Sequence, residues 1–158
     1  MAYESCTLDG LYVLRWGDLP QITDVTRYCE ETRRAHAEQG KPVVGLFIMP
    51  THSKPPDEAF RKEQARLLPE IMSHFSYAVA VFEGVGFLSS LKRSALAAIL
   101  LLAPKRHAIF VRSTLEEALL TDPAGPIDFD ARKAIGELRR RGLIVSSISG
   151  AEPAPARR

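Results

Sequence analysis

Val43-Val-Gly-Leu-Phe-Ile-Met49 is the stretch that decides the fold, because it carries no charged or strongly polar side chain. A strand that is apolar on both faces is typical of the centre of a sheet covered by helices on each side. Tyr77-Ala-Val-Ala-Val-Phe82 has the same character. These segments therefore predict two central strands of one buried sheet.

Further strands are indicated on either side of this pair. Leu11–Trp16 is rich in aromatic and branched residues, and Asp9-Gly10 before it is typical of a hairpin turn, which makes Ser5–Leu8 an antiparallel partner. His107–Val111 is the last clear strand pattern. Between the strands, apolar residues recur at helical spacing over residues 20–39, 56–75 and 88–103.

The alternation of strands and helices predicts an α/β domain over residues 1–121. Its sheet is expected to be mostly parallel, with four to five strands and an antiparallel strand at the N-terminal end. Pro69 is expected to kink or break the helix in which it lies. Residues 122–150 are expected to form a helical extension packed on this domain, and residues 151–158, rich in Pro, Ala and Arg, a disordered tail.

Local signals divide the C-terminal part of the chain further. Thr114 and Glu117 have the spacing of a capping box, which predicts a short helix as far as Leu120. A second helix is expected over residues 130–141, and residues 143–148 are expected to form an edge strand.

Composition narrows the functional classes. The chain has 158 residues and a formal net charge of +2, too small to indicate a nucleic-acid partner. Its most hydrophobic stretch, Leu96–Ala103, is far shorter than the roughly 20 residues of a membrane span. Cys6 and Cys29 show no CxxC spacing, which favours free thiols in a reducing compartment. Residues 1–6 lack a signal-peptide pattern, so we expect a cytoplasmic protein with no membrane span.

Glu83-Gly-Val-Gly-Phe-Leu-Ser-Ser-Leu91 is the strongest candidate site. It connects a buried strand to a helix at the sheet edge where open α/β folds bind ligands. Gly84 and Gly86 allow a tight turn, and Ser89 or Ser90 could help the free N–H groups of the helix start to bind a phosphate or carboxylate. The alternative is that a serine caps the helix. The spacing fits neither a dinucleotide fingerprint nor a P-loop.

A second candidate, His52 with Ser53, lies in the loop after the first central strand. If the strands are parallel, the 51–56 and 83–90 loops lie at one sheet edge, and a ligand is expected in the crevice between them. His52 as a general base with Ser53 or Ser89 is a catalytic alternative, and a solvated loop histidine is the simpler one. The four histidines show no ligand spacing, so neither a metal nor another cofactor is expected.

The run Val79–Ala98 resembles the core of the STAS domain (sulphate transporter and anti-sigma-factor antagonist), with its buried strand, Gly-Val turn, serine pair and small-residue helix. In that family an Asp-Ser-Ser/Thr-Gly motif follows the turn, and a partner kinase phosphorylates its serine. Ser89 and Ser90 match the serines, whereas Leu88 and Leu91 replace the acidic residue and the glycine. The element order is also similar to the wider STAS-like class, which includes lipid-binding CRAL-TRIO relatives.

Together, these observations predict a non-catalytic regulatory module of STAS-like type. It is expected to bind a protein partner, or a second copy of itself as a homodimer, around Gly84, Gly86, Ser89 and Ser90. The alternative is a module that binds a small anion or a lipid in the crevice between the 51–56 and 83–90 loops.

Overall fold

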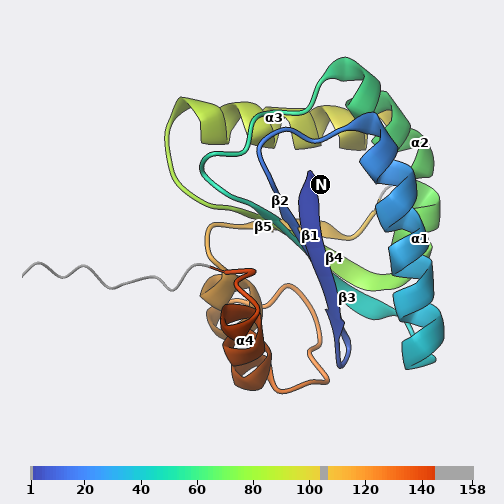
Figure 1. Ribbon diagram of the computed structural model, residues 1–158, viewed down its shortest axis with the longest axis vertical. Helices are drawn as coiled ribbons and strands as arrows, with labels where there is room; N and C mark the ends of the chain where they lie inside the picture. The colour runs from blue at the N-terminus through green and yellow to red at the C-terminus, as the bar shows by residue number, and fades with distance from the viewer. Residues whose placement is uncertain (1, 104–106, 145–158) are drawn as a thin grey trace, which may run out of the picture.

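A five-stranded sheet forms the centre of the molecule in the computed structural model, which describes residues 2–103 and 107–144 (Figure 1). The first two strands pair antiparallel and all the others pair parallel, which confirms the predicted α/β fold. In chain order, which is also their order in the sheet, the strands are β1 (Tyr3–Leu8), β2 (Leu11–Trp16), β3 (Val43–Met49), β4 (Phe75–Phe82) and β5 (Ile109–Arg112).

Helices cover both faces of the sheet (Figure 1). Because the parallel strands follow one another across the sheet, right-handed crossovers place the three connecting helices on one face. The fourth helix packs on the opposite face. The helices are α1 (Ile22–Gln39), α2 (Glu58–Ser73), α3 (Phe87–Leu102), a π-helical turn η1 (Glu117–Thr121) and α4 (Ala131–Arg140).

Each face of the sheet has its own hydrophobic cluster. Beneath α1 and α2 the cluster is aromatic: the Trp16 ring meets Tyr28 and Phe60 edge to face, at centroid distances of 5.9 and 5.4 Å. On the opposite face, Ile135 and Leu138 of α4 pack with aliphatic side chains of β2, β3 and β4. The residues of the two central strands face both clusters, as their apolar sequence predicts.

Three local expectations need correction. Pro69 does not break α2, which is continuous and is held on the sheet by buried Leu68 and Ile71 on either side of the proline. Residues 143–144 are not in a strand; residues 145–148 and the expected tail lie outside the described residues. The predicted capping box is shifted: Thr114 accepts from the Glu117 N–H, but the Glu117 carboxylate accepts from the N–H of Ser113 instead of Thr114.

Candidate functional site

The loops that follow β3 and β4 touch at the carboxyl edge of the sheet. The backbone N–H of Glu83 donates to the Met49 carbonyl at 3.0 Å. Gly84 has a φ of +82°, and a Cβ on it would stand 2.8 Å from Thr51 Oγ1. The turn therefore needs glycine at this position, both for its backbone conformation and for the close approach of the two loops.

The start of α3 is an uncapped helix N-terminus. Gly86, with a φ of +98°, occupies the N-cap position, and the first turn contains no acidic residue. The hydroxyls of Ser89 and Ser90 make no hydrogen bond with another described residue, so the serine-cap alternative does not hold. The reason is that glycine takes the cap position and places both serines inside the first turn. The first helical N–H groups are left for another partner.

A hollow with several polar side chains in its lining lies against this helix start. It is lined by the 84–86 turn, by Ser89, Ser90 and Arg93 of α3, and by Ser113 and Thr114 after β5. Ser89 is 7% exposed although its hydroxyl is unbonded. The carboxyl ends of β4 and β5 thus supply opposite walls of one hollow, as expected at this edge of a parallel sheet.

Among the described residues, Arg93 is the one charged residue that lines this hollow. The Arg93 guanidinium lies 5.2 Å from the centroid of the Phe82 ring and forms no ion pair with a described carboxylate. The nearby Glu83 carboxylate is paired with Arg15 at 3.1 Å. Glu117 is the acidic neighbour that remains, and its carboxylate accepts the Ser113 N–H at 3.1 Å. An oxyanion in the hollow would therefore meet N–H groups, hydroxyls and one guanidinium without an ion pair to a described carboxylate, with the Glu117 carboxylate as the opposing charge nearby.

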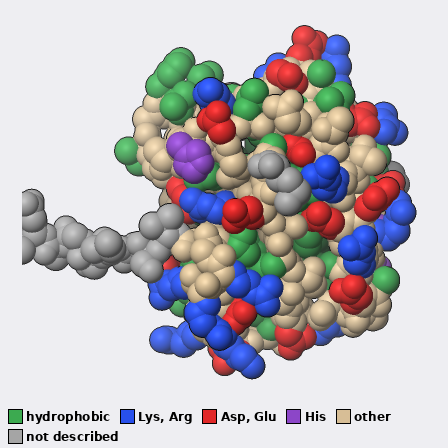
Figure 2. Space-filling model, in the orientation of Figure 1, with side chains coloured by type: hydrophobic (Ala, Val, Ile, Leu, Met, Phe, Trp, Pro, Cys, Tyr) green, Lys and Arg blue, Asp and Glu red, His purple; other side chains and the backbone are tan. Residues whose placement is uncertain are grey.

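Large apolar side chains surround the hollow on the outside. Val85 is 96% exposed and Phe87 is 77% exposed, with Leu88 and Leu91 also exposed. Figure 2 shows hydrophobic side chains gathered over the start of α3, at the upper left of the view. We call these four residues, Val85, Phe87, Leu88 and Leu91, the apolar rim. A group of large apolar side chains exposed together in this way is unusual on a protein surface.

A separate cavity of about 70 Å³ lies on the inner side of α3, between that helix, α2 and the sheet. Most of its lining is apolar, and Lys54 and Pro56 of the 51–56 loop complete it. Lys54 is exposed, so the cavity reaches solvent beside this loop. Its principal apolar lining residues are Trp16, Phe47, Phe60, Leu68, Phe82 and Ile99.

Lys92 is a buried cation on the wall of this cavity. Its side chain is only 3% exposed, and its Nζ donates to the Pro50 carbonyl at 2.7 Å and to the Thr51 carbonyl at 3.5 Å. No described carboxylate forms an ion pair with it. Burial lowers the pKa of the Lys92 ammonium, because removal from water disfavours the charged form.

Two hydroxyl groups add to the polar content of the cavity wall. Tyr28 is fully buried, and its hydroxyl has no hydrogen-bond partner among the described residues. Ser53 is 1% exposed, and its side chain makes no hydrogen bond with a described residue. Burial raises the pKa of the Tyr28 phenol well above its usual value, so the group stays neutral. A buried hydroxyl that lacks a partner, as that of Tyr28 does among the described residues, is uncommon in proteins.

The structure does not bring the catalytic alternative together. His52 is exposed and lines a shallow hollow with Tyr3 and Arg15, whereas Ser53 lines the inner cavity and Ser89 the hollow at the start of α3. A general base must lie within hydrogen-bond reach of the group it deprotonates. The contact between the two loops agrees with the expectation from parallel strands. The roles of Lys92 and Tyr28 have no signal in the sequence, because neither burial nor a missing partner leaves one.

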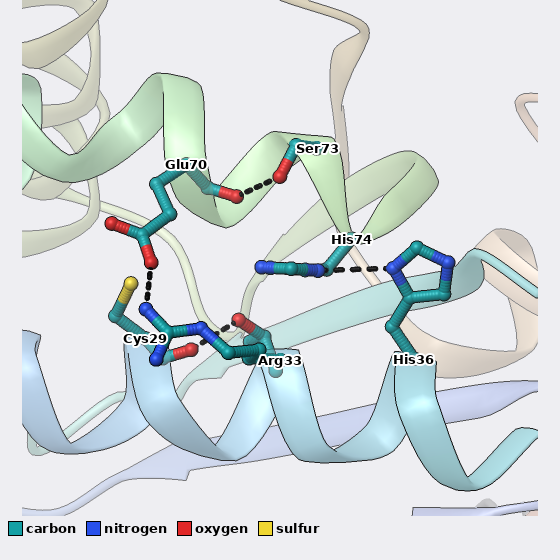
Figure 3. Close-up of polar contacts among 7 residues, drawn as sticks. Cys29, Arg33, His36, Glu70, Ser73 and His74 are labelled. Atoms are coloured by element: carbon teal, nitrogen blue, oxygen red, sulfur yellow. Dashed lines mark hydrogen bonds and ion pairs between the residues drawn. The ribbon is translucent and has the colours of Figure 1, made fainter.

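A histidine pair joins the end of α2 to α1 (Figure 3). His36 Nδ1 and His74 Nδ1 are 3.0 Å apart, and Nε2 of His74 is buried without a partner among the described residues. Burial, with the nearby His36 and Arg33 charges, lowers the pKa of His74. This pair has no sequence signal, because its members are 38 residues apart.

The neighbours of this pair are structural in character (Figure 3). Glu70 of α2 forms a hydrogen-bonded ion pair with Arg33 of α1. Burial and the adjacent Glu70 raise the pKa of the Cys29 thiol to about 11, so that it is protonated and unreactive near neutral pH. Within residues 2–103 and 107–144, no group of three or more His, Cys, Asp or Glu side chains could hold a metal ion.

No protein-family model matches the chain, and no curated protein is detectably similar to it. In the described part of the chain, no helix is both long enough and apolar enough to cross a membrane.

Proposed function

We propose that this chain is a non-catalytic, regulatory binding module of STAS-like type, acting in the cytoplasm, that recognises a phosphate-like oxyanion at the start of α3. The observation that carries the proposal is the uncapped N-terminus of α3 beside Ser89, whose hydroxyl makes no hydrogen bond with a described residue, and Arg93, which forms no ion pair with a described carboxylate. The STAS-like assignment rests on the run Val79–Ala98 and on the order of strands and helices.

The physical basis is the combination of aligned donors with positive charge. A helix N-terminus carries roughly half a positive charge, and its first N–H groups point towards an anion placed on the axis. Asp, Asn, Ser and Thr are preferred at this position because their side chains accept from these N–H groups, but α3 has Gly86 there, which has no side chain to do so. Arg93 adds a planar donor suited to a bidentate contact with phosphate. Each such charge-assisted hydrogen bond contributes about 1.5–3 kcal/mol.

Isothermal titration calorimetry with inorganic phosphate and with O-phosphoserine, at low ionic strength, tests this proposal. Arg93→Gln should lower the affinity for both ligands about tenfold, which corresponds to about 1.4 kcal/mol of binding free energy. Arg132→Gln is the matched control, because Arg132 is an exposed arginine on α4, on the other face of the sheet. The proposal fails if neither ligand binds, or if the two arginine variants weaken binding equally.

A protein partner is the second candidate, and the exposed apolar rim around the hollow favours it. A partner segment that presents an acidic or phosphorylated side chain next to an apolar one would match both features. The Val85→Ser/Phe87→Ser variant should lose any partner captured by the wild-type chain and identified by mass spectrometry. Leu101→Ser removes an equally exposed apolar side chain from the far end of α3 and should retain it. Equal retention by both variants would contradict a docking role for the rim.

A further inference from the structure

The wall of the cavity on the inner side of α3 includes a buried cation that has no salt-bridge partner among the described residues, although the charge of Glu83 acts on it at longer range. The Lys92 ammonium has three donors, and the Pro50 and Thr51 carbonyls accept from two of them. Burying an ammonium without a counter-ion is unfavourable. Glu83 is the carboxylate whose charge acts on Lys92, but it forms its salt bridge with Arg15, so an anion entering from the cavity could pair with the ammonium directly.

The rest of the wall indicates which kind of anion fits. Phe60, Leu68 and Ile99 offer an apolar surface, so the anion must bring an apolar part with it. The unpaired hydroxyls of Tyr28 and Ser53 add hydrogen-bonding capacity that a purely apolar ligand would leave unused. Inorganic phosphate has no such apolar part, which separates this cavity from the polar hollow outside.

The size of the cavity limits the apolar part. Its volume of about 70 Å³ is less than half that of an engineered apolar cavity of roughly 150 Å³ that binds benzene. A tail of a few carbon atoms fits this space, whereas a lipid acyl chain is too long to be enclosed. The cavity opens beside exposed Lys54, which gives a ligand a route from solvent.

We propose that this cavity binds a short-chain aliphatic carboxylate, with its carboxylate on the Lys92 ammonium and its tail between α2, α3 and the sheet. The site is distinct from the hollow at the start of α3 and does not depend on the proposed function. Lys92 lies on the inner side of the same helix whose first turn borders that hollow.

Butanoate is the probe, and the full chain carries its own reporter. Trp16 is the single tryptophan and lines the cavity, so its fluorescence should change saturably as butanoate binds. The melting temperature should rise at the same time, because the ligand binds the folded state. Acetate tests the need for a tail, and butan-1-ol tests the need for a charge.

Three variants assign the binding to the cavity. Lys92→Met should lower the affinity for butanoate at least about tenfold and leave the affinity for butan-1-ol unchanged. Ala95→Leu fills the cavity from α3 without touching the charge, and it should weaken both ligands. Lys133→Met removes an exposed lysine from α4 and should change neither.

Several results would overturn the proposal. These are an absence of any response to butanoate, wild-type affinity in Lys92→Met, and wild-type affinity in Ala95→Leu.

The length of the ligand tail gives a further test. If the affinity keeps rising about fourfold per added CH₂ as far as octanoate, the cavity does not confine the tail and the assignment of a short-chain ligand is wrong. If Lys92→Met does not fold, Ala95→Leu and the comparison of butanoate with butan-1-ol still decide the question. Phosphate binding outside should survive Ala95→Leu, so the two proposals can fail separately.

Discussion

Lys92 Nζ on α3 donates a 2.7 Å hydrogen bond to the backbone carbonyl of Pro50, across 42 residues of sequence. This contact ties the loop after β3 to the helix after β4. It therefore links the inner cavity to the position of the turn at the start of α3.

Lys92→Met should loosen the loop more than it destabilises the fold. Loss of a hydrogen bond to a charged group costs about 1.5–3 kcal/mol, and release of a buried ammonium offsets much of this. Hydrogen exchange should therefore speed up at the Ser53 N–H, which donates to Pro50 O at 3.0 Å, with little change in global stability. Unchanged exchange at Ser53 would show that Lys92 does not hold the loop.

Tyr28→Phe should stabilise the protein, by about 1 kcal/mol, because it removes a buried hydroxyl that has no partner among the described residues. Tyr12→Phe is the matched control: Tyr12 is equally buried, but its hydroxyl donates to Glu31 at 2.8 Å. That variant should be destabilised by about 1 kcal/mol. Urea unfolding measures both, and an equal loss in the two variants would mean that the Tyr28 hydroxyl is satisfied in solution.

Gly84→Ala should lower the free energy of unfolding by more than the strain of its positive φ alone. Both Gly84 and Gly86 have positive φ, but only a Cβ on Gly84 meets an obstacle, Thr51. A Thr51→Ala change should therefore recover about 1 kcal/mol of the loss in Gly84→Ala and nothing in Gly86→Ala. The free energies of unfolding of the double variants measure this coupling. Equal recovery in both would place the strain in the backbone alone.

Acid should destabilise the contact between α1 and α2 through His74. Its pKa is lowered in the folded chain, so the unfolded chain binds the proton more tightly. The stabilising contribution is complete above about pH 6.5, the usual histidine pKa, and is lost as the pH falls through the lower folded pKa. His74→Gln should flatten this part of the stability profile, measured by thermal unfolding across pH. His52→Gln, at an exposed loop position, should leave it unchanged.

The sequence predicts those parts of the structure that depend on local patterns. Val43–Met49 is apolar on both faces and therefore had to be a central strand, and Asp9-Gly10 made the first hairpin. The meeting of the 51–56 and 83–90 loops followed from parallel strands alone. Gly86 at the N-cap was not predictable, because a serine in the same turn is the more common cap.

The inner cavity was missed for a different reason. Lys92 belongs to a helix of small and apolar residues, and lysine is almost never buried, so its burial is not predictable from its residue type. His36 and His74 meet only because α1 and α2 pack side by side. Such contacts depend on tertiary structure, and short-range spacing does not reveal them.

Backbone amide chemical shifts during a phosphate titration test the central claim most directly, because they locate the bound anion. The account predicts saturable shifts centred on the N–H groups of Phe87, Leu88 and Ser89, reduced about tenfold in affinity by Arg93→Gln and unaffected by Arg132→Gln. Shifts that are absent, or spread over basic residues of α4 with the first turn of α3 unmoved, would contradict it.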